Sequence, residues 1–293
     1  MKKHENYEIW LHSDDELSKI SGMKVVKREP LRGWPLSVVE RITFSDGTSR
    51  IYKAYYNLPM EAEFYRKAHS PHIPKVFFNL SDGDRHWLLL EDVNGHHPLN
   101  LNREQLLDLS RRVQKIVCGI KAIEPNRYDL SGKGYGSFIG STIGLLSKLH
   151  LEGKLKIVDG GAIAFIEEAL SHTDVLSTVH GQCTVLHGDL KCDNILVRSD
   201  GEIVIIDWQS ILFGPADIDM YSLMATQAID PVPIAGIGPE ILRMALEIRW
   251  FADCLDRWMP YPEFLDGKIS NIVKHMRHVV ENNGYADMKV YCF

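Results

Sequence analysis

The sequence lacks several features that would point to a secreted, membrane-bound or nucleic-acid-binding protein. Its 293 residues contain five cysteines and no C-x-x-C pair, so we expect reduced thiols and a cytoplasmic location. No apolar run reaches the length of a membrane span, and the segment Met1–Glu8 is polar rather than an apolar signal core. The formal net charge of −6 disfavours a nucleic-acid partner. We therefore expect a globular protein with neither a membrane nor a nucleic-acid partner.

Signatures of other site classes are also missing. There is no G-K-[ST] of a phosphate-binding P-loop, and the glycine-rich segment 131–137 has no strand before it, so it predicts a flexible loop. The pair His96-His97 has no further ligands at zinc spacing. A chain of this length that is 45% hydrophobic can nevertheless bury two cores.

The residues that can carry chemistry are concentrated between His187 and Trp208. The stretch 187–194 reads H-G-D-L-K-C-D-N, and Asp207 follows within I-D-W at 206–208. An Asp-rich hairpin could merely cap a turn, but several such residues in one order and spacing are a stronger signal than any one of them. The set offers a base, a lysine and two oxygen ligands, which is what phosphoryl transfer requires.

The local pattern predicts how these residues are arranged. Short apolar runs at 194–197 and 202–206 flank the turn signal Ser199-Asp200-Gly201, which indicates a β-hairpin. A hairpin brings its two ends together, so Asn194 and Asp207 can face one Mg²⁺ ion. Asp189 lies just before the hairpin, on a loop.

The order H-G-D-L-K-x-x-N followed by I-D-W resembles the catalytic and metal loops of the aminoglycoside phosphotransferase and choline kinase-like family, small-molecule kinases with the protein-kinase fold. The resemblance implies that Asp189 is the catalytic base and that Lys191 contacts the γ-phosphate. It implies that Asn194 and Asp207 bind Mg²⁺ and that His187 buttresses the loop.

Two residues depart from the protein-kinase version of these motifs. Gly188 stands where H-R-D has arginine, so the usual receptor of an activation-loop phosphate is missing. Trp208 stands where D-F-G has phenylalanine, which argues against regulation by a flipping phenylalanine.

An N-terminal nucleotide lobe is expected upstream. Strands are predicted at 24–26, 37–44 and 49–55, and Lys53 ends the third of them. The resemblance implies that Lys53 binds the α- and β-phosphates and pairs with a carboxylate of the helical run 60–66. We choose Glu61 over Glu63, because E-x-x-F-Y resembles the corresponding helix of the family. A solvated lysine on an edge strand is the alternative.

Two further segments of this lobe are expected to touch the nucleotide. The loop 29–37 has the position of the loop that covers the phosphates, with Gly33 and Ser37 as candidates, although it carries one glycine instead of three. The segment 87–95 resembles the hinge, where backbone groups of Glu91, Asp92 and Val93 would bind adenine. Backbone recognition does not distinguish ATP from GTP.

The helix predicted to begin at Asp217 separates two hypotheses. Its D-x-(aromatic)-S-L pattern resembles the kinase helix whose aspartate bonds the catalytic-loop backbone, which assigns Asp219 as a brace; Asp217 could instead be a helix N-cap. Protein kinases place an activation segment ending in A-P-E before this helix. Here Gly238-Pro239-Glu240 comes after it, so a small acceptor is favoured over a peptide.

The C-terminal lobe is predicted to be mainly helical and to bind the acceptor. Helical spacing covers 101–123, 142–151, 162–179, 240–258 and 261–281. Acids there could meet an amine and aromatics could stack on a sugar or a quaternary ammonium, although such residues more often serve solvation or the core. The candidates chosen are Asp230, Trp250, Asp253 and Trp258; Asp256, Tyr261 and Glu263 are weaker.

We therefore predict an α+β, bilobal protein-kinase-like fold, with a small antiparallel-sheet lobe at 1–91 and a larger, mainly helical lobe at 92–293. The predicted activity is transfer of the γ-phosphate of ATP, with Mg²⁺, to a hydroxyl of a small molecule. An aminoglycoside or related antibiotic is the first expectation. Choline, an amino sugar or another metabolite is the alternative; a protein kinase and a catalytically silent nucleotide-binding scaffold are the remaining ones.

Overall fold

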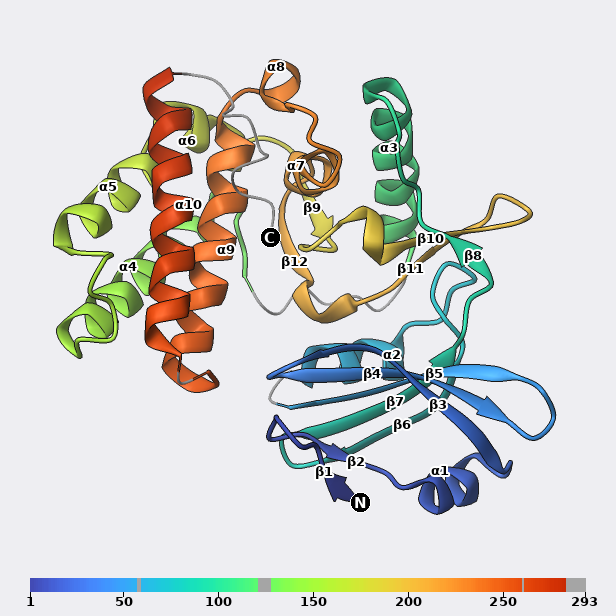
Figure 1. Ribbon diagram of the computed structural model, residues 1–293. Coiled ribbons are helices and arrows are strands. Elements are labelled where there is room, and N and C mark those ends of the chain that lie inside the picture. Colours follow the sequence, from blue (N-terminus) through green and yellow to red (C-terminus); the bar gives the residue numbers. More distant parts are fainter. Residues whose placement is uncertain (57–58, 121–127, 260, 283–293) are drawn as a thin grey trace. The chain divides into compact units, whose positions relative to one another are not determined.

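A computed structural model describes residues 1–56, 59–120, 128–259 and 261–282 (Figure 1). The chain forms two compact units, which we describe one at a time. Unit 1 comprises Met1–Pro98, Ile120–Ile123 and Asp193–Gln209, and unit 2 comprises Leu99–Gly119, Glu124–Cys192 and Ser210–Phe293. These units differ from the expected lobes 1–91 and 92–293, because the segment 193–209 groups with the N-terminal sheet rather than with the helices.

Unit 1 is built on a five-stranded antiparallel sheet with the order β3-β4-β5-β7-β6. Buried and less buried residues alternate along β4, as expected for a strand that packs on one face. The Asp46-Gly47 turn, with Gly47 at φ 84°, joins β4 to β5. The strands are β3 (Val25–Trp34), β4 (Ser37–Phe44), β5 (Ser49–Tyr56), β6 (Val76–Asp82) and β7 (Arg85–Glu91).

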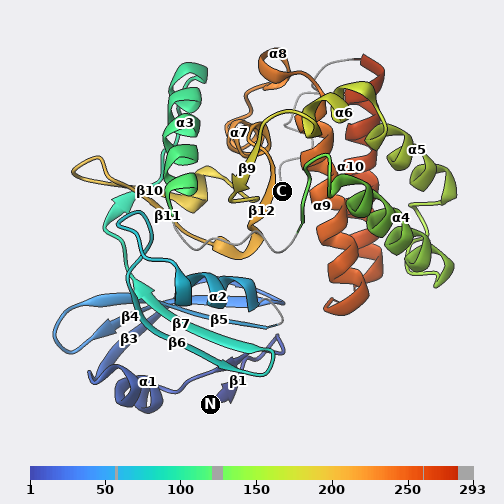
Figure 2. The same ribbon diagram turned by 180° about the vertical axis from the view of Figure 1, so that it is seen from behind.

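The two faces of this sheet have different partners. Tyr52 and Ala54 of β5 point into a core that the N-terminal segment closes with Ile9 and Leu17. That segment contains β1 (Lys2–Lys3), β2 (Trp10–Leu11) and α1 (Asp14–Ser21). Lys53, between them in sequence, points to the other face, where α2 (Pro59–Lys67) lies. Figures 1 and 2 show α1 and α2 on opposite faces.

The predicted hairpin is present and belongs to unit 1. Strands β10 (Ile195–Arg198) and β11 (Ile203–Ile205) pair antiparallel, and β8 (Gly95–His96) adds a third strand beside β10. The N–H of Ile205 donates to the carbonyl of His72 at 2.9 Å, in the segment between α2 and β6. These long-range backbone bonds explain why residues 193–209 group with the sheet of unit 1. No local sequence pattern predicts them.

Unit 2 is mainly helical. The long helices α9 and α10 run side by side in both views (Figures 1 and 2). Two short strands, β9 (Cys183–Leu186) and β12 (Leu212–Pro215), pair with each other and flank the segment 187–211 in the sequence. The helices are α3 (Arg103–Gly119), α4 (Tyr135–Leu151), α5 (Gly160–Leu170), α6 (Thr173–Val179), α7 (Asp217–Ala225), α8 (Val232–Ala235), α9 (Gly238–Arg257) and α10 (Pro262–Asn282).

The predicted α+β class is confirmed, with three local corrections. The expected loop 29–37 is mostly strand, because β3 continues to Trp34 and leaves a tight turn before Ser37. The expected flexible loop 131–137 becomes helix α4 from Tyr135, whose buried ring anchors it. The expected helix 162–179 is two helices, since His172 caps the start of α6. The end of the expected helix 101–123 lies outside the described residues.

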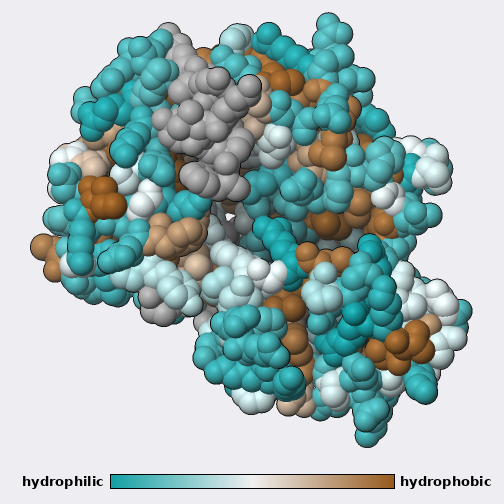
Figure 3. All heavy atoms as spheres, in the orientation of Figure 1, coloured by the Kyte–Doolittle hydropathy of each residue, from teal (hydrophilic) through white to brown (hydrophobic). Residues whose placement is uncertain are grey.

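In the described part of the chain, no helix combines the length and the apolar composition that crossing a bilayer would need. Figure 3 shows hydrophilic residues over most of the visible face, with hydrophobic residues scattered among them. None of the four described cysteines, Cys118, Cys183, Cys192 and Cys254, forms a disulfide.

Candidate active site

A buried cluster of one lysine and two carboxylates forms the centre of unit 1. Lys53 Nζ lies 2.6 Å from Glu61 Oε2 and 2.7 Å from Asp207 Oδ1. The side chains of Lys53 and Glu61 are 10% and 1% exposed, and that of Asp207 is 20% exposed. Glu61 is thus the partner of Lys53, as chosen from the sequence, and Asp207 is a second partner that was not expected.

Three elements bring this cluster together. Strand β5 presents Lys53, helix α2 presents Glu61, and Asp207 follows β11 with a positive φ of 66°. A non-glycine residue in this region is uncommon and indicates a position fixed by its surroundings. The ring of Trp208, fully buried, stacks on Phe64 of α2 at a centroid distance of 4.4 Å. This stack holds the loop that carries Asp207 against the helix that carries Glu61.

The charges within the cluster shift one another. Burial raises the pKa of Glu61 to about 7, against the attraction of Lys53, and the charge of Asp207 adds to the rise. Burial alone would lower the pKa of Lys53, but the carboxylates of Asp207 and Glu61 outweigh it and raise that pKa. The lysine therefore carries its charge throughout the neutral range.

The donor atoms near Asp207 suit a magnesium ion. Asn194 is buried just before β10, and Asp207 follows the end of β11. The N–H of Ile206 donates to the carbonyl of Asn194 at 3.0 Å, so the two ends of the hairpin meet as predicted. An amide oxygen and a carboxylate fit Mg²⁺, which takes few protein ligands and completes its shell with water and phosphate. No group of three His, Cys, Asp or Glu side chains in the described ranges forms a different metal site.

The loop that carries Asp189 and Lys191 lies in unit 2 and is more exposed than the lysine cluster. Lys191 Nζ and Asp189 Oδ1 are 2.8 Å apart, with side chains that are 46% and 30% exposed. Desolvation alone would lower the pKa of Lys191, but the carboxylate of Asp189 outweighs it and the pKa is raised. The pair thus sets a positive charge beside a carboxylate that solvent can reach.

Asp219 fixes the backbone of this loop. Its carboxylate accepts hydrogen bonds from the N–H groups of His187, at 2.8 Å, and Gly188, at 2.9 Å. Burial raises the pKa of Asp219 above its ordinary value, against these bonds and the proximity of His187. Asp217 opens α7 as its first residue and not as its N-cap, which is Ala216. His187 itself is fully buried beside Asp219.

Gly188 has a steric role that its position in the H-G-D motif did not predict. It adopts a φ of 79°, and a Cβ atom built on it would lie 2.0 Å from the carbonyl oxygen of Ser210. Real Cβ atoms essentially never approach so closely. An arginine there would require the backbone to move, so glycine is needed for the loop to pass Ser210.

The expected hinge residues make contacts of their own. The N–H of Glu91 donates to the carbonyl of Lys75 at 2.8 Å. This N–H group is therefore not available to adenine, contrary to the expectation from the sequence. Its carboxylate binds Arg198 at 2.7 Å. The carboxylate of Asp92 accepts from Arg41, at 2.7 Å, and from Ser49. Val93 is buried after the end of β7.

The two candidates at the β3–β4 turn lie close together. The hydroxyl of Ser37 accepts a hydrogen bond from Trp34 Nε1 at 2.7 Å, which closes the turn. A Cβ built on Gly33 would reach the ring of Tyr7 at 3.5 Å, an ordinary contact. The available space therefore does not require a glycine at position 33. The role of Gly33 in holding phosphates stays a prediction.

The four candidate acceptor-binding residues of unit 2 lie in different environments. Asp253 is 5% exposed; its Oδ2 accepts hydrogen bonds from Tyr128 and Arg249, and its Oδ1 has no hydrogen-bond partner among the described residues, so its contact with an amine stays a prediction. Asp230 accepts from the N–H of Val232 at the start of α8. Trp250 and Trp258 pack on each other, with centroids 5.6 Å apart. Of the weaker candidates, Asp256 pairs with Lys148, and Tyr261 and Glu263 are exposed.

Comparisons with known proteins agree with this geometry. The model of a protein family described as "phosphotransferase enzyme family" matches residues 50–261 of the chain. A search of curated proteins found no match. Among solved structures, a fructosamine-3-kinase homologue from Haemophilus somnus 129PT aligns with a TM-score of 0.54 and 12% identity, over 89% of this chain and 96% of that one.

Two aminoglycoside phosphotransferases have a similar fold. The ADP-bound APH(2'')-Ib structure aligns with a TM-score of 0.53 and 16% identity, over 95% of this chain and 98% of that one. The streptomycin-ATP-APH(2'')-IIa ternary complex aligns with a TM-score of 0.52 and 15% identity, over 97% and 100%. Both likenesses confirm the predicted kinase-like fold. Since the family match spans well over half of its residues, the chain belongs to the phosphotransferase enzyme family, as an enzyme of the small-molecule kinase class.

Proposed function

We propose that the protein transfers the γ-phosphate of ATP, in the presence of Mg²⁺, to a hydroxyl of a small molecule. The observation that carries the proposal is the buried Lys53–Glu61–Asp207 cluster, supported by family membership. Glu61 orients the ammonium of Lys53, which would hold the α- and β-phosphates. Asp207 and Asn194 would bind the metal, which neutralises charge on the transferring group.

The chemistry at the acceptor falls to unit 2. Asp189 is partly exposed and can accept the proton of the acceptor hydroxyl as it attacks. Lys191, 2.8 Å away, can meet the γ-phosphate, as the motif implies. Asp219 and Gly188 keep the loop in one conformation without a phosphorylated side chain. A catalytically silent scaffold would have no use for this full set of groups.

An aminoglycoside or a related antibiotic is the acceptor we propose first. Two of the similar folds belong to aminoglycoside phosphotransferases, one of them with streptomycin bound, and the net charge of −6 suits a cationic acceptor. A fructosamine-3-kinase homologue favours an amino sugar as the second candidate. Choline or another metabolite hydroxyl completes the set. We place the enzyme in the cytoplasm, because none of its described cysteines forms a disulfide.

The test is a panel of acceptors in an assay that couples ADP release to a signal. Aminoglycosides, amino sugars, fructosamines and choline are each offered with MgATP or MgGTP. We expect ADP release that depends on one class of acceptor and on Mg²⁺. Release that no acceptor stimulates, in protein shown to be folded, would contradict the proposal.

A further inference from the structure

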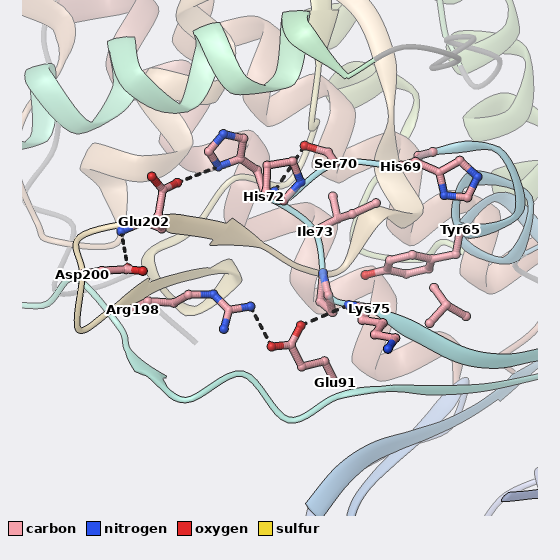
Figure 4. A pocket seen from close by; sticks show the side chains of 14 residues that line it. Tyr65, His69, Ser70, His72, Ile73, Lys75, Glu91, Arg198, Asp200 and Glu202 are labelled. Carbon is pink, nitrogen blue, oxygen red and sulfur yellow. Dashed lines mark hydrogen bonds and ion pairs between the residues drawn. The ribbon is translucent and has the colours of Figure 1, made fainter.

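Unit 1 contains a pocket that the proposed reaction does not use. It has a volume of about 820 Å³ and is formed by the end of α2, the segment 68–76, the end of β7 and the β10–β11 hairpin (Figure 4). We call it the α2 pocket. Of the residues assigned to the reaction, Glu91 alone contributes to its lining, and with its side chain. This volume lies within the range of pockets that bind small ligands.

One buried polar group in the pocket lacks a partner. Tyr65 is 3% exposed, and its hydroxyl forms no hydrogen bond with any residue that the structure describes. Figure 4 shows this hydroxyl directed into the space that the other labelled side chains surround. Buried hydroxyl groups are almost always hydrogen-bonded, because an unmade bond loses the interaction with water. Burial, and the charge of Glu61, raise the pKa of Tyr65, so the group remains a donor.

The polar groups beside Tyr65 are also mainly donors. Arg198 uses one nitrogen, Nη2, for Glu91, and its other nitrogens have no hydrogen-bond partner within the described ranges. The carboxylate of Glu91 is already occupied, since it also accepts the N–H of Lys75 at 3.2 Å. The side chain of Lys75 is exposed at the same wall; its Nζ lies 5.3 Å from the centre of the Phe77 ring and forms no hydrogen bond with any described residue. Tyr65, Arg198 and Lys75 therefore present hydrogen-bond donors without an acceptor to match them.

The acidic residues of the pocket lie at its other end. In Figure 4, Asp200 and Glu202 stand beside His72, away from Tyr65. Glu202 Oε2 is 3.6 Å from His72 Nδ1, and Asp200 accepts the N–H of Glu202 at 3.0 Å. Their charge is thus engaged locally and does not cover the donors of the Tyr65 end.

We propose that the α2 pocket binds a small organic anion, a carboxylate or a phosphate, whose charged group is held by the hydroxyl of Tyr65, the ammonium of Lys75 and the guanidinium of Arg198. Hydrogen bonds to an ionised acceptor are stronger than those between neutral groups, so such a ligand satisfies the buried hydroxyl best. The apolar wall of Ala68, Ile73 and Val76 accommodates its carbon skeleton.

The site has a physical connection to the lysine cluster. Tyr65 follows Glu61 by one turn on α2, so a ligand that fixes Tyr65 also fixes the helix that presents Glu61 to Lys53. This consequence rests on the proposed function. Occupancy of the α2 pocket then changes nucleotide affinity, and nucleotide changes anion affinity by the same factor.

The experiment titrates the full chain with citrate and, separately, with inorganic phosphate by calorimetry at constant ionic strength, with and without saturating MgADP. Tyr65→Phe removes the unpartnered hydroxyl alone, and Tyr55→Phe is its control, because Tyr55 is equally buried but does not line the pocket. Lys75→Gln tests the ammonium, with the exposed Lys24→Gln as a control for charge.

We expect saturable binding of at least one anion, weakened about tenfold or more in Tyr65→Phe and in Lys75→Gln but not in either control. Without anion, Tyr65→Phe should be as stable as the wild type or more so. If the anion binds but MgADP does not, the proposed function is contradicted while the proposed anion site is supported. No saturable binding, binding unaffected by both pocket variants, or binding abolished by MgADP would each overturn the proposal.

Discussion

The lysine cluster of unit 1 and the loop of unit 2 that carries Asp189 and Lys191 place similar charged groups in opposite settings, one buried and one exposed. Lys53 and its two carboxylates come from elements far apart in the sequence, and Glu61 is 1% exposed. Asp189 and Lys191 are two residues apart, and their side chains are 30% and 46% exposed. The first arrangement depends on the sheet, α2 and the hairpin all being folded, whereas the second depends on a short loop held by Asp219.

Under the proposed function, this difference separates nucleotide binding from the reaction with the acceptor. A buried lysine between carboxylates is held rigidly, which suits the binding of a nucleotide that is always the same. A solvent-accessible pair can meet acceptors of various shapes. We therefore expect substitutions in the cluster to change nucleotide binding and stability, and substitutions in the loop to change turnover.

The largest effect is expected from Asp189→Ala. Turnover should fall by about 10²–10⁴-fold, because a positioned general base contributes about that much, while MgATP binding and stability remain unchanged. Steady-state kinetics with the acceptor found in the panel would measure it. Asp193→Ala, an exposed aspartate of the same loop, is the control and should keep turnover. If Asp189→Ala turns over normally, the base lies elsewhere.

Asp207→Ala should weaken nucleotide binding. The variant loses a metal ligand and one of the two carboxylates beside Lys53, so MgADP affinity should fall by about tenfold or more. Calorimetric titration with and without Mg²⁺ would show it. Asp46→Ala, at the exposed β4–β5 turn, should bind as the wild type does. Affinity that Mg²⁺ still enhances in Asp207→Ala would move the metal site away from this residue.

Gly188→Ala tests how tightly the loop is confined. The added Cβ meets the carbonyl of Ser210 at 2.0 Å, so unfolding of unit 2 should become easier by about 1–3 kcal/mol. Gly153→Ala is the matched control, because Gly153 also has a positive φ, of 70°, but nothing lies within 4 Å of its Cβ. Denaturant unfolding would compare them. Equal losses in the two variants would show that the contact with Ser210 does not matter.

A smaller effect concerns the pH dependence of stability. Burial raises the pKa of Glu61 to about 7, so the folded state holds a proton that the unfolded chain releases at lower pH. The contribution of this group is therefore largest in acid and is lost as the pH rises to about 7. We expect the melting temperature to fall more steeply over that range in the wild type than in Glu61→Gln. Identical slopes would mean that Glu61 stays ionised.

The smallest expected effect is that of an activating phosphorylation, which should be none. Gly188 offers no arginine to a phosphate, and the carboxylate of Asp219 already bonds the loop backbone. Protein made in bacteria and shown by intact mass to be unmodified should be active at once. Activity that appears only after treatment with an upstream kinase would favour the protein-kinase alternative.

The sequence predicts what is encoded in short patterns. The turn at Ser199–Gly201 gives the β10–β11 hairpin, and the E-x-x-F-Y pattern selects Glu61 over Glu63 as the partner of Lys53. The α+β class follows from alternation and spacing in the same way, as do strands β4 and β5, which were expected at 37–44 and 49–55. Each of these depends on contacts within a strand, a helix or a tight turn, where residue type and conformation are directly linked.

Features that depend on distant segments could not be predicted in this way. The pairing of Glu91 with Arg198 and the bond from Ile205 to His72 join residues more than a hundred positions apart. They decide that the hairpin belongs to unit 1. The contact of Gly188 with Ser210 is of the same kind, although a lone glycine between His187 and Asp189 was a signal that space is limited there.

The most direct test of the account follows the γ-phosphoryl group itself. Unmodified protein is incubated with Mg²⁺ and ATP labelled in the γ-phosphate, together with the acceptor panel, and the label is located by mass spectrometry. We expect the label on a hydroxyl of one small-molecule class. Asp189→Ala should still bind MgATP but transfer about 10²–10⁴-fold less, and Asp207→Ala should bind MgATP about tenfold more weakly or worse. Label found on polypeptide or released only as inorganic phosphate would contradict the account.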